Sequence, residues 1–248
     1  MPFDCRNTGH AGNGLNDADV AHKLEHLHQA ASGRDARVFA RALPAIIAGK
    51  FTGRSTFEAA EPYLSKAYIP VSEEFGRFMY LTALSRGARN IVEFGSSYGI
   101  SSIYLAAAAR ETGGFFTGTE KDPDKARTAM QNLNDAGLSR WSDIREGDAL
   151  ENLAPLEGPV DFLFLDGWKD LYIPVLKLME PKLAPGAVIF ADNIKSFRKT
   201  LKPFVDYISD VSNGYETTIL DIGSGVSLSV WRGAECHSGK IRIDNHSQ

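Results

Sequence analysis

The sequence predicts an α/β protein with a doubly wound, Rossmann-like sheet of seven strands. From about residue 70 onward, short apolar runs alternate with segments of helical periodicity, the pattern of parallel strands joined by crossover helices. Several of these runs are apolar throughout, as in Phe162–Leu165, which is typical of strands buried on both faces of a parallel sheet. The predicted sheet is therefore mostly parallel, with helices on both sides.

The strands are expected in a regular order along the chain. Their predicted ranges are Asn90–Phe94, Phe115–Glu120, Ser142–Glu146, Val160–Asp166, Ala187–Asp192, Glu216–Leu220 and Val226–Arg232. Helices fill most gaps; the one after Glu120 has Asp122 at its N-cap, Pro123 at its first position and its end near Gly137. The last two strands are separated by only 221–225, too short for a helical crossover, so they are expected to form an antiparallel hairpin.

The chain divides into four predicted parts. Residues 1–16 are polar and rich in Gly and Asn and are expected to be flexible, as is the tail 234–248. Residues 17–69 form a helical N-terminal extension, with helical patterns over 17–31, 34–49 and 56–67. This extension is expected to serve as a lid or as a subunit contact, for example in a homodimer. Residues 70–233 form the α/β domain.

Composition excludes several classes of function. The chain of 248 residues is 43% hydrophobic and 23% charged, with a net charge of −4, which is ordinary for a globular protein and does not favour nucleic acid as a partner. No apolar stretch reaches membrane-spanning length. The two cysteines, Cys5 and Cys236, lie near opposite ends, so no disulfide framework is expected and a cytoplasmic location is favoured.

Two apolar runs end at a carboxylate. One is followed by Asp166 and then Lys169, and the other by Asp192 and Asn193. Ligands of parallel α/β sheets sit beyond the carboxyl ends of the strands, where these side chains would stand side by side. Two carboxylates and an amide oxygen suit a hard cation such as Mg²⁺, and an amine beside a metal is a candidate general base. The two ligands Asp192 and Asn193 can share one ion only if the strand ends between them, because adjacent strand residues face opposite sides.

A glycine-bearing loop joins the first strand to the next helix. It reads Glu93-Phe94-Gly95-Ser96-Ser97-Tyr98-Gly99 and lacks the G-x-G-x-x-G spacing that suits a pyrophosphate. Glu120 ends the following strand, where an acidic side chain accepts hydrogen bonds from ribose hydroxyls. Loop and carboxylate together indicate a nucleoside ligand such as S-adenosylmethionine. Asp148 ends the third strand and has two alternatives, a contact with the adenine amino group or an N-cap paired with Glu151.

These motifs together resemble one family. The segments E-F-G-S-S-Y-G at 93–99, D-G-W-K-D-L-Y at 166–172 and A-D-N at 191–193, with Glu120, resemble the class I S-adenosylmethionine-dependent, Mg²⁺-dependent O-methyltransferases, and most closely the catechol O-methyltransferases. The resemblance covers about 68–232 and implies that residues 70–233 are the methyltransferase domain. It implies that Asp166, Asp192 and Asn193 hold the metal and that Lys169 is the base.

The resemblance also implies contacts with the donor and the methyl acceptor. Phe197 lies where these enzymes have a wall of the substrate pocket, and Gly167 stands where they have a histidine. The predicted donor contacts are Val71, Glu93, Gly95, Ser96, Ser101, Glu120, Asp148, Ala149, Asp166 and Trp168. The predicted substrate contacts are Lys169, Asn193 and Phe197.

The sequence thus predicts an enzyme that moves a methyl group from S-adenosylmethionine to a hydroxyl of a small, catechol-like vicinal diol. One alternative is a related methyltransferase acting on a sugar or another non-aromatic hydroxyl. Another is a non-catalytic protein that binds S-adenosylmethionine, which the presence of Lys169 and all three metal ligands disfavours. A nicotinamide oxidoreductase is disfavoured by the missing G-x-G-x-x-G.

Overall fold

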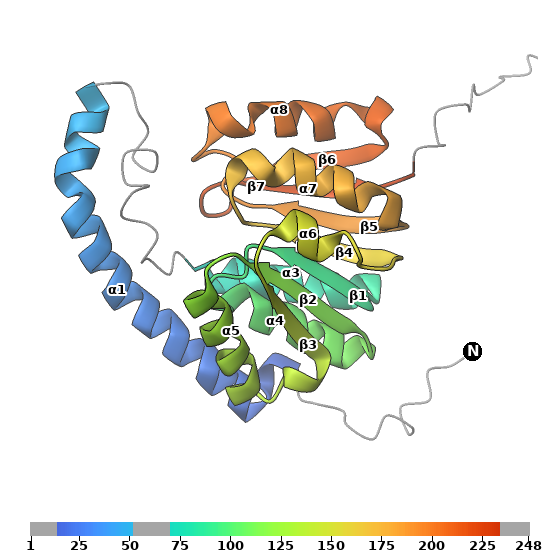
Figure 1. The fold of residues 1–248 in the computed structure, drawn as a ribbon, viewed down its shortest axis with the longest axis horizontal. Helices are drawn as coiled ribbons and strands as arrows, with labels where there is room; N and C mark the ends of the chain where they lie inside the picture. Colours follow the sequence, from blue (N-terminus) through green and yellow to red (C-terminus); the bar gives the residue numbers. More distant parts are fainter. Residues whose placement is uncertain (1–13, 52–69, 234–248) are drawn as a thin grey trace, which may run out of the picture.

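A computed structural model describes residues 14–51 and 70–233. Seven strands form one sheet in the order β3-β2-β1-β4-β5-β7-β6, and helices cover both of its faces (Figure 1). The strands are β1 Asn90–Phe94, β2 Phe115–Glu120, β3 Ser142–Glu146, β4 Val160–Leu165, β5 Leu183–Ala191, β6 Tyr215–Leu220 and β7 Val226–Trp231. The helices are α1 Ala18–Phe51, α3 Glu73–Arg86, α4 Ile100–Thr112, α5 Pro123–Asp135, α6 Ala149–Leu153, α7 Tyr172–Met179 and α8 Arg198–Ser209.

The mixed sheet confirms the predicted fold class. Strands β3, β2, β1, β4 and β5 pair in parallel, and β6 and β7 form the expected antiparallel hairpin. The hairpin joins the sheet through β7, which pairs antiparallel with β5 and so lies between β5 and β6. This insertion brings the turn that joins β6 to β7 to the end of β5 where the chain continues past Ala191.

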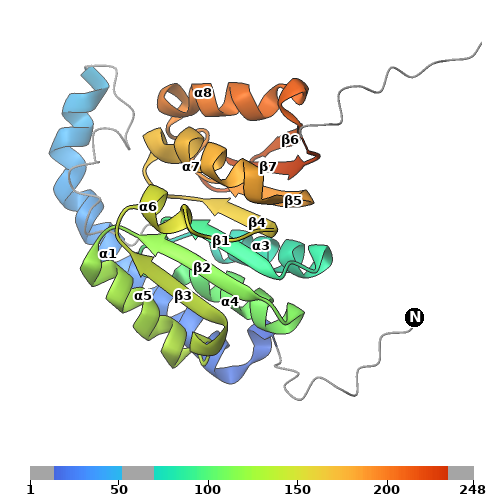
Figure 2. The same cartoon turned by 45° about the vertical axis from the view of Figure 1, so that its right-hand side comes forward.

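The central strand β4 is apolar from Phe162 to Leu165 because it divides these side chains between two cores. Phe162 and Phe164 of β4 belong to a core shared with α1, α3, α4 and α5. The alternate residues Leu163 and Leu165 belong to a second core shared with α6, α7 and α8. Successive side chains of a strand point to opposite faces, so a strand covered on both sides favours apolar residues at successive positions. The two helical layers are visible on either side of the sheet in Figure 2.

The start of α5 follows its predicted signals. The side chain of Asp122 accepts hydrogen bonds from the backbone N–H groups of Asp124 and Lys125, and Pro123 occupies the first turn. Gly137 follows the helix with a φ of +68°, a conformation that glycine adopts without steric cost. The local sequence therefore determines both ends of this helix.

The N-terminal extension differs from the prediction. The ranges 17–31 and 34–49 were expected as two helices, but they form the single helix α1, and the intervening Ser32 and Gly33 are helical. One interior glycine costs only about 1 kcal/mol relative to alanine, too little to end a helix whose neighbours favour it. The first half of α1 packs on α4 and α5, and its second half extends past the helical layer (Figures 1 and 2).

Residues 14–16, predicted as part of a flexible N-terminus, form a short 3₁₀ turn. Leu15 is buried, and the guanidinium of Arg110 donates a hydrogen bond to the carbonyl oxygen of Gly14. The remaining predicted flexible residues 1–13 and 234–248, and the predicted helix 56–67, lie outside the described residues. In the described part of the chain, no helix is both long and apolar enough to cross a bilayer.

The docking of α1 can be tested with two leucines of the same helix. Leu27 is 3% exposed within the core, whereas Leu43 is 53% exposed. We expect Leu27→Ala to lower the free energy of unfolding by about 2–5 kcal/mol, because it leaves a cavity. Leu43→Ala should change it by less than about 0.5 kcal/mol. Urea unfolding of both variants measures the difference; equal effects would show that α1 is not docked through Leu27.

Candidate active site

Parallel pairing places the ends of β1, β4 and β5 at one edge of the sheet. Phe94, Leu165 and Ala191 are register partners, so the residues that follow each strand are neighbours. The N–H of Asp166 donates to the carbonyl oxygen of Phe94 at 2.9 Å, and the N–H of Asp192 donates to that of Leu165 at 3.1 Å. The two aspartates therefore stand side by side, as the sequence predicts.

The chain turns sharply after β5. The strand ends at Ala191, and Asn193 has a φ of +66° in the left-handed region, which asparagine tolerates better than most residues. The alternation of a strand is thereby broken before both candidate ligands. Oδ1 of Asp192 accepts from the N–H of Asn193 at 2.5 Å and from the hydroxyl of Ser224 at 2.9 Å. The strand therefore ends before Asp192 and not between Asp192 and Asn193 as expected, and strand geometry does not hold the two side chains to opposite faces.

Lys169 lies against the first aspartate. Its Nζ donates to Oδ1 of Asp166 at 3.1 Å and to the hydroxyl of Tyr172 at 3.0 Å. The hydroxyl of Tyr172 in turn donates to the carbonyl oxygen of Asp192 at 3.2 Å. The side chain of Lys169 is only 14% exposed, and the ring of Phe197 lies 5.7 Å from its Nζ. The amine is thus held at the carboxyl edge by two acceptors.

Burial alters the pKa of both carboxylates. Burial raises the pKa of Asp166 to about 7; the ammonium of Lys169 opposes this and the charge of Asp192 adds to it. Burial also raises the pKa of Asp192, although hydrogen bonds from Asn193 and Ser224 oppose that rise. Two such carboxylates beside an amide oxygen fit a hard cation, whose charge would offset their repulsion. Among the described residues, no group of three or more His, Cys, Asp or Glu side chains could hold a metal, so the ligand set depends on Asn193.

The loop after β1 approaches the loop after β4 so closely that both carry glycine. A Cβ on Gly95 would lie 2.5 Å from the Cα of Gly167, and a Cβ on Gly167 would lie 2.4 Å from the ring of Phe94. Gly95 also has a φ of +93°. These contacts give a physical reason for the glycine at 167, since a side chain there would need Phe94 and the first loop to move.

The glycine loop is held from beneath by a buried carboxylate. Glu93 is fully buried, and its Oε2 accepts from the hydroxyl of Ser96 at 2.7 Å and from that of Ser102 at 2.5 Å. Burial raises the pKa of Glu93, while the hydroxyls of Ser101, Ser102 and Ser96 oppose the rise. Glu93 is thus buried beneath the loop that it holds, and its contact with the donor stays a prediction.

Comparisons with known proteins agree with this geometry. A family model described as a methyltransferase domain matches residues 92–194. Catechol O-methyltransferase of Niastella koreensis is 36% identical over 143 residues, covering 55% of this chain and 64% of that protein. Catechol O-methyltransferase of Mycobacterium tuberculosis is 35% identical over 127 residues, covering 51% and 57%. The crystal structure of the O-methyltransferase TomG from Streptomyces achromogenes, in complex with SAM, has a TM-score of 0.61 and 26% identity, covering 66% and 82%.

Residues 92–194 match a methyltransferase domain, and the chain is similar to catechol O-methyltransferases and to a solved O-methyltransferase over about half to two thirds of its length. It spans less than two thirds of the length of the two catechol O-methyltransferases. The family match begins in β1 and ends just past Asn193, so it contains the glycine loop, Lys169 and all three candidate metal ligands.

Glu120, the predicted ribose contact, ends β2 beside the glycine loop. Its two carboxylate oxygens accept from the N–H groups of Ser97 and Asp122, each at 2.8 Å. The carboxylate is thereby fixed between the glycine loop and α5, and its contact with ribose stays a prediction. Asp148 accepts from the N–H of Leu150 and caps α6, which confirms its capping role and leaves the adenine contact untested.

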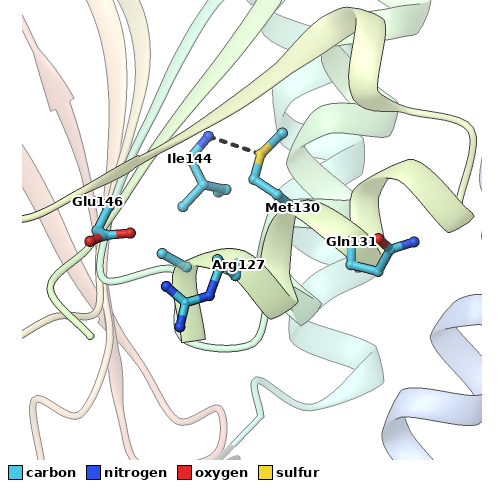
Figure 3. Close-up of a pocket in the computed structure, with 6 residues that line it drawn as sticks. Arg127, Met130, Gln131, Ile144 and Glu146 are labelled. Atoms are coloured by element: carbon cyan, nitrogen blue, oxygen red, sulfur yellow. Dashed lines mark hydrogen bonds between the residues drawn. The ribbon is translucent and has the colours of Figure 1, made fainter. Parts of the chain in front are cut away.

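The other predicted donor contacts differ in accessibility. Val71, Ser96, Ser101 and Ala149 are buried in this structure, whereas Trp168 is 56% exposed. Trp168 stands just past Asp166 and Gly167, so its ring is open to a ligand at the edge. A separate hollow between α5 and the edge strand β3 is lined by Ala126, Arg127, Met130, Gln131, Ile144 and Glu146 (Figure 3). None of the predicted site residues lines this hollow, where the sulfur of Met130 accepts the N–H of Ile144.

No role was predicted for two residues that the structure places in this site, Tyr172 and Ser224. Tyr172 belongs to the D-G-W-K-D-L-Y segment and lies three residues past Lys169, a spacing that could have indicated their contact. Ser224 comes from the turn between β6 and β7, and a serine in a Gly-rich turn gives no sequence signal of its contact with Asp192. Only the insertion of β7 beside β5 brings it there.

The raised pKa of Asp166 predicts a pH-dependent stability. An aspartate in an unfolded chain has a pKa of about 3.9, so between that value and about 7 the folded, metal-free protein keeps a proton that the unfolded chain has lost. The contribution of Asp166 to the free energy of unfolding therefore falls as pH rises through that window, by at most about 1.4 kcal/mol per pH unit. The variant Asp166→Asn should gain stability relative to the wild type across the same window.

Urea unfolding in EDTA at several pH values between about 5 and 7 measures this difference, within the window set by the two pKa values. The exposed Asp170, in the same turn, offers a matched control: Asp170→Asn should change the pH dependence less than Asp166→Asn does. A difference between Asp166→Asn and wild type that does not vary with pH would contradict the raised pKa.

Proposed function

We propose that this chain transfers a methyl group from S-adenosylmethionine to one hydroxyl of a small, catechol-like vicinal diol, with a divalent cation such as Mg²⁺. The observation that carries the proposal is the meeting of Asp166, Asp192, Asn193 and Lys169 at one strand edge. The relatives named as catechol O-methyltransferases support the choice of acceptor. A cytoplasmic location and a homodimer through the N-terminal helices stay predictions of the sequence.

Asp166, Asp192 and Asn193 would hold the cation. When bound, it supplies a Lewis acid that lowers the pKa of a hydroxyl and orients both oxygens of the diol. The methyl group of the donor is transferred by in-line substitution, so the acceptor oxygen must be held in position. The half-buried ring of Phe197, near Lys169, is suited to form one wall for an aromatic acceptor.

Lys169 would remove the proton of the attacking hydroxyl. A neutral amine has two hydrogens and one lone pair. The hydrogens match the two acceptors in place, Oδ1 of Asp166 and the hydroxyl oxygen of Tyr172. Because Tyr172 donates its own hydrogen to the carbonyl of Asp192, its oxygen is oriented to accept. The lone pair of Lys169 is then the part of the amine left to take a proton.

A methyl-transfer assay on a panel of catechols and non-aromatic diols, with and without EDTA, tests the proposal. We expect turnover on catechols, its loss in EDTA and its return with Mg²⁺. Asp192→Ala should lose turnover while calorimetry still detects the donor, because Asp192 is a predicted metal ligand and not a predicted donor contact. Full activity in excess EDTA would contradict the proposed requirement for a divalent cation. Turnover only on non-aromatic diols would support that alternative acceptor, and donor binding without any turnover would support a non-catalytic protein.

Replacement of Lys169 by Met tests the base. Met keeps the length and apolar packing but removes the amine, and loss of a general base typically costs about 10²–10⁴-fold in kcat. We expect a fall of that size, with little change in donor affinity. The defect should shrink as pH rises and for catechols with electron-withdrawing groups, whose hydroxyls ionise without help. Lys202→Met, an exposed lysine paired with Asp206 on α8, is the control. A Lys169→Met enzyme with near-normal kcat, measured where chemistry limits the rate, would exclude Lys169 as the base.

A further inference from the structure

The turn between β6 and β7 is fastened to the segment that carries the second aspartate. The N–H of Ile194 donates to the carbonyl oxygen of Gly225 at 2.9 Å, and that of Lys195 donates to the carbonyl oxygen of Ser224 at 3.0 Å. Gly225 has a φ of +85°, and a Cβ there would lie 2.9 Å from the backbone nitrogen of Lys195. Backbone contacts therefore hold the two segments close together. They fix the position of the turn, and with it the position of the Ser224 side chain.

That side chain joins both candidate ligands. Its hydroxyl donates to Oδ1 of Asp192 at 2.9 Å and accepts from Nδ2 of Asn193 at 2.7 Å. A serine hydroxyl has one hydrogen and two lone pairs, so a single group can serve as donor to the carboxylate and acceptor from the amide. The two bonded residues, Asn193 and Asp192, precede Ser224 in the sequence by 31 and 32 positions.

These two bonds decide which atoms Asp192 and Asn193 present. With Nδ2 of Asn193 bonded to Ser224, the oxygen of that amide is the atom left for a cation. With Oδ1 of Asp192 already accepting from Ser224 and from the N–H of Asn193, Oδ2 is the oxygen left. A rotated amide would turn an NH₂ group, which has only donors, toward the positive ion. The hydroxyl of Ser224 therefore keeps the amide in the orientation that a cation needs.

We propose that Ser224 is a positioning residue that presents Asp192 and Asn193 as a preformed pair of cation ligands. This inference rests on the proposed function for the presence of the cation. It adds a residue from outside the matched family segment 92–194 to the machinery of the site. Groups that orient metal ligands in this way typically change metal affinity about 10–100-fold when they are removed.

Binding of Mn²⁺ to the protein without donor or acceptor tests the proposal, with free Mn²⁺ followed by its EPR signal. We expect Ser224→Ala to weaken Mn²⁺ binding about 10–100-fold, and Ser224→Thr, which keeps the hydroxyl, to restore most of the affinity. Ser224→Cys keeps the size of the side chain but has only a weak S–H donor, so it should also bind Mn²⁺ more weakly than the wild type. Calorimetry in EDTA should give the same affinity for S-adenosylmethionine in all variants.

Ser229→Ala is the matched control. Ser229 is a buried serine of the same hairpin whose hydroxyl contacts that of Thr217 at 2.9 Å. It lies away from the aspartates, and its removal should leave Mn²⁺ affinity unchanged. Equal Mn²⁺ affinity in wild type and Ser224→Ala, or in Ser224→Cys if the alanine variant does not fold, would overturn the role of Ser224 and leave the proposed function standing. A wild-type protein that does not bind Mn²⁺ would overturn the metal itself, and with it both proposals.

Discussion

The burial of two neighbouring carboxylates at one edge of the sheet is the constraint around which this site is organised. Asp166 and Asp192 end neighbouring strands, and burial alone favours their protonated forms. Three nearby groups supply positive charge or hydrogen-bond donors: the amine of Lys169, the N–H of Asn193 and the hydroxyl of Ser224. These donors offset part of the cost of burying two charges. Without a bound cation, these donors do not fully offset that cost. A cation at this site would offset more of it, so the pair is suited to bind one.

Close backbone packing keeps this edge compact. The loops after β1 and β4 meet at Gly95 and Gly167; a side chain at Gly95 would meet the backbone of Gly167, and one at Gly167 would meet the ring of Phe94. The carboxylate of Glu93 fixes the first loop from below through serine hydroxyls, and Glu120 fixes it from the side through the N–H of Ser97. The position of the loop is therefore determined by several independent bonds, so it is already shaped before a ligand arrives.

Tyr172 connects the chemistry of the edge to the core. Its ring makes edge-on contacts with Phe94 and Phe204, at centroid distances of 6.3 and 5.4 Å, inside the core that α7 and α8 share with the sheet. Its hydroxyl reaches Lys169 and the carbonyl of Asp192. A close-packed ring has few alternative positions, so the packing of the second core is transmitted to the amine of Lys169.

Much of this arrangement is local enough to be predicted from the sequence. Apolar runs followed by carboxylates predict β4 and β5 and their ends, because burial of an unpaired charge is costly. The cap of α5 by Asp122 and the side-by-side position of Asp166 and Asp192 follow from neighbouring residues and from the parallel order of the strands. The join of 17–31 with 34–49 into one helix was not predicted, because helix continuity there depends on small propensities and on packing against α4 and α5.

Other features depend on contacts between segments far apart in the sequence. The burial of Glu93 is decided by how the glycine loop folds back over β1, and the contact of Ser224 with Asp192 and Asn193 by the insertion of β7 between β5 and β6. The sequence by itself thus determined the class of fold, the strand ends and the residues that carry charge to one edge, since these follow from local periodicity and burial. Only the tertiary structure decided which oxygen each ligand presents and which side chain holds it there, because hydrogen-bond partners distant in sequence are set by the packing of the whole sheet.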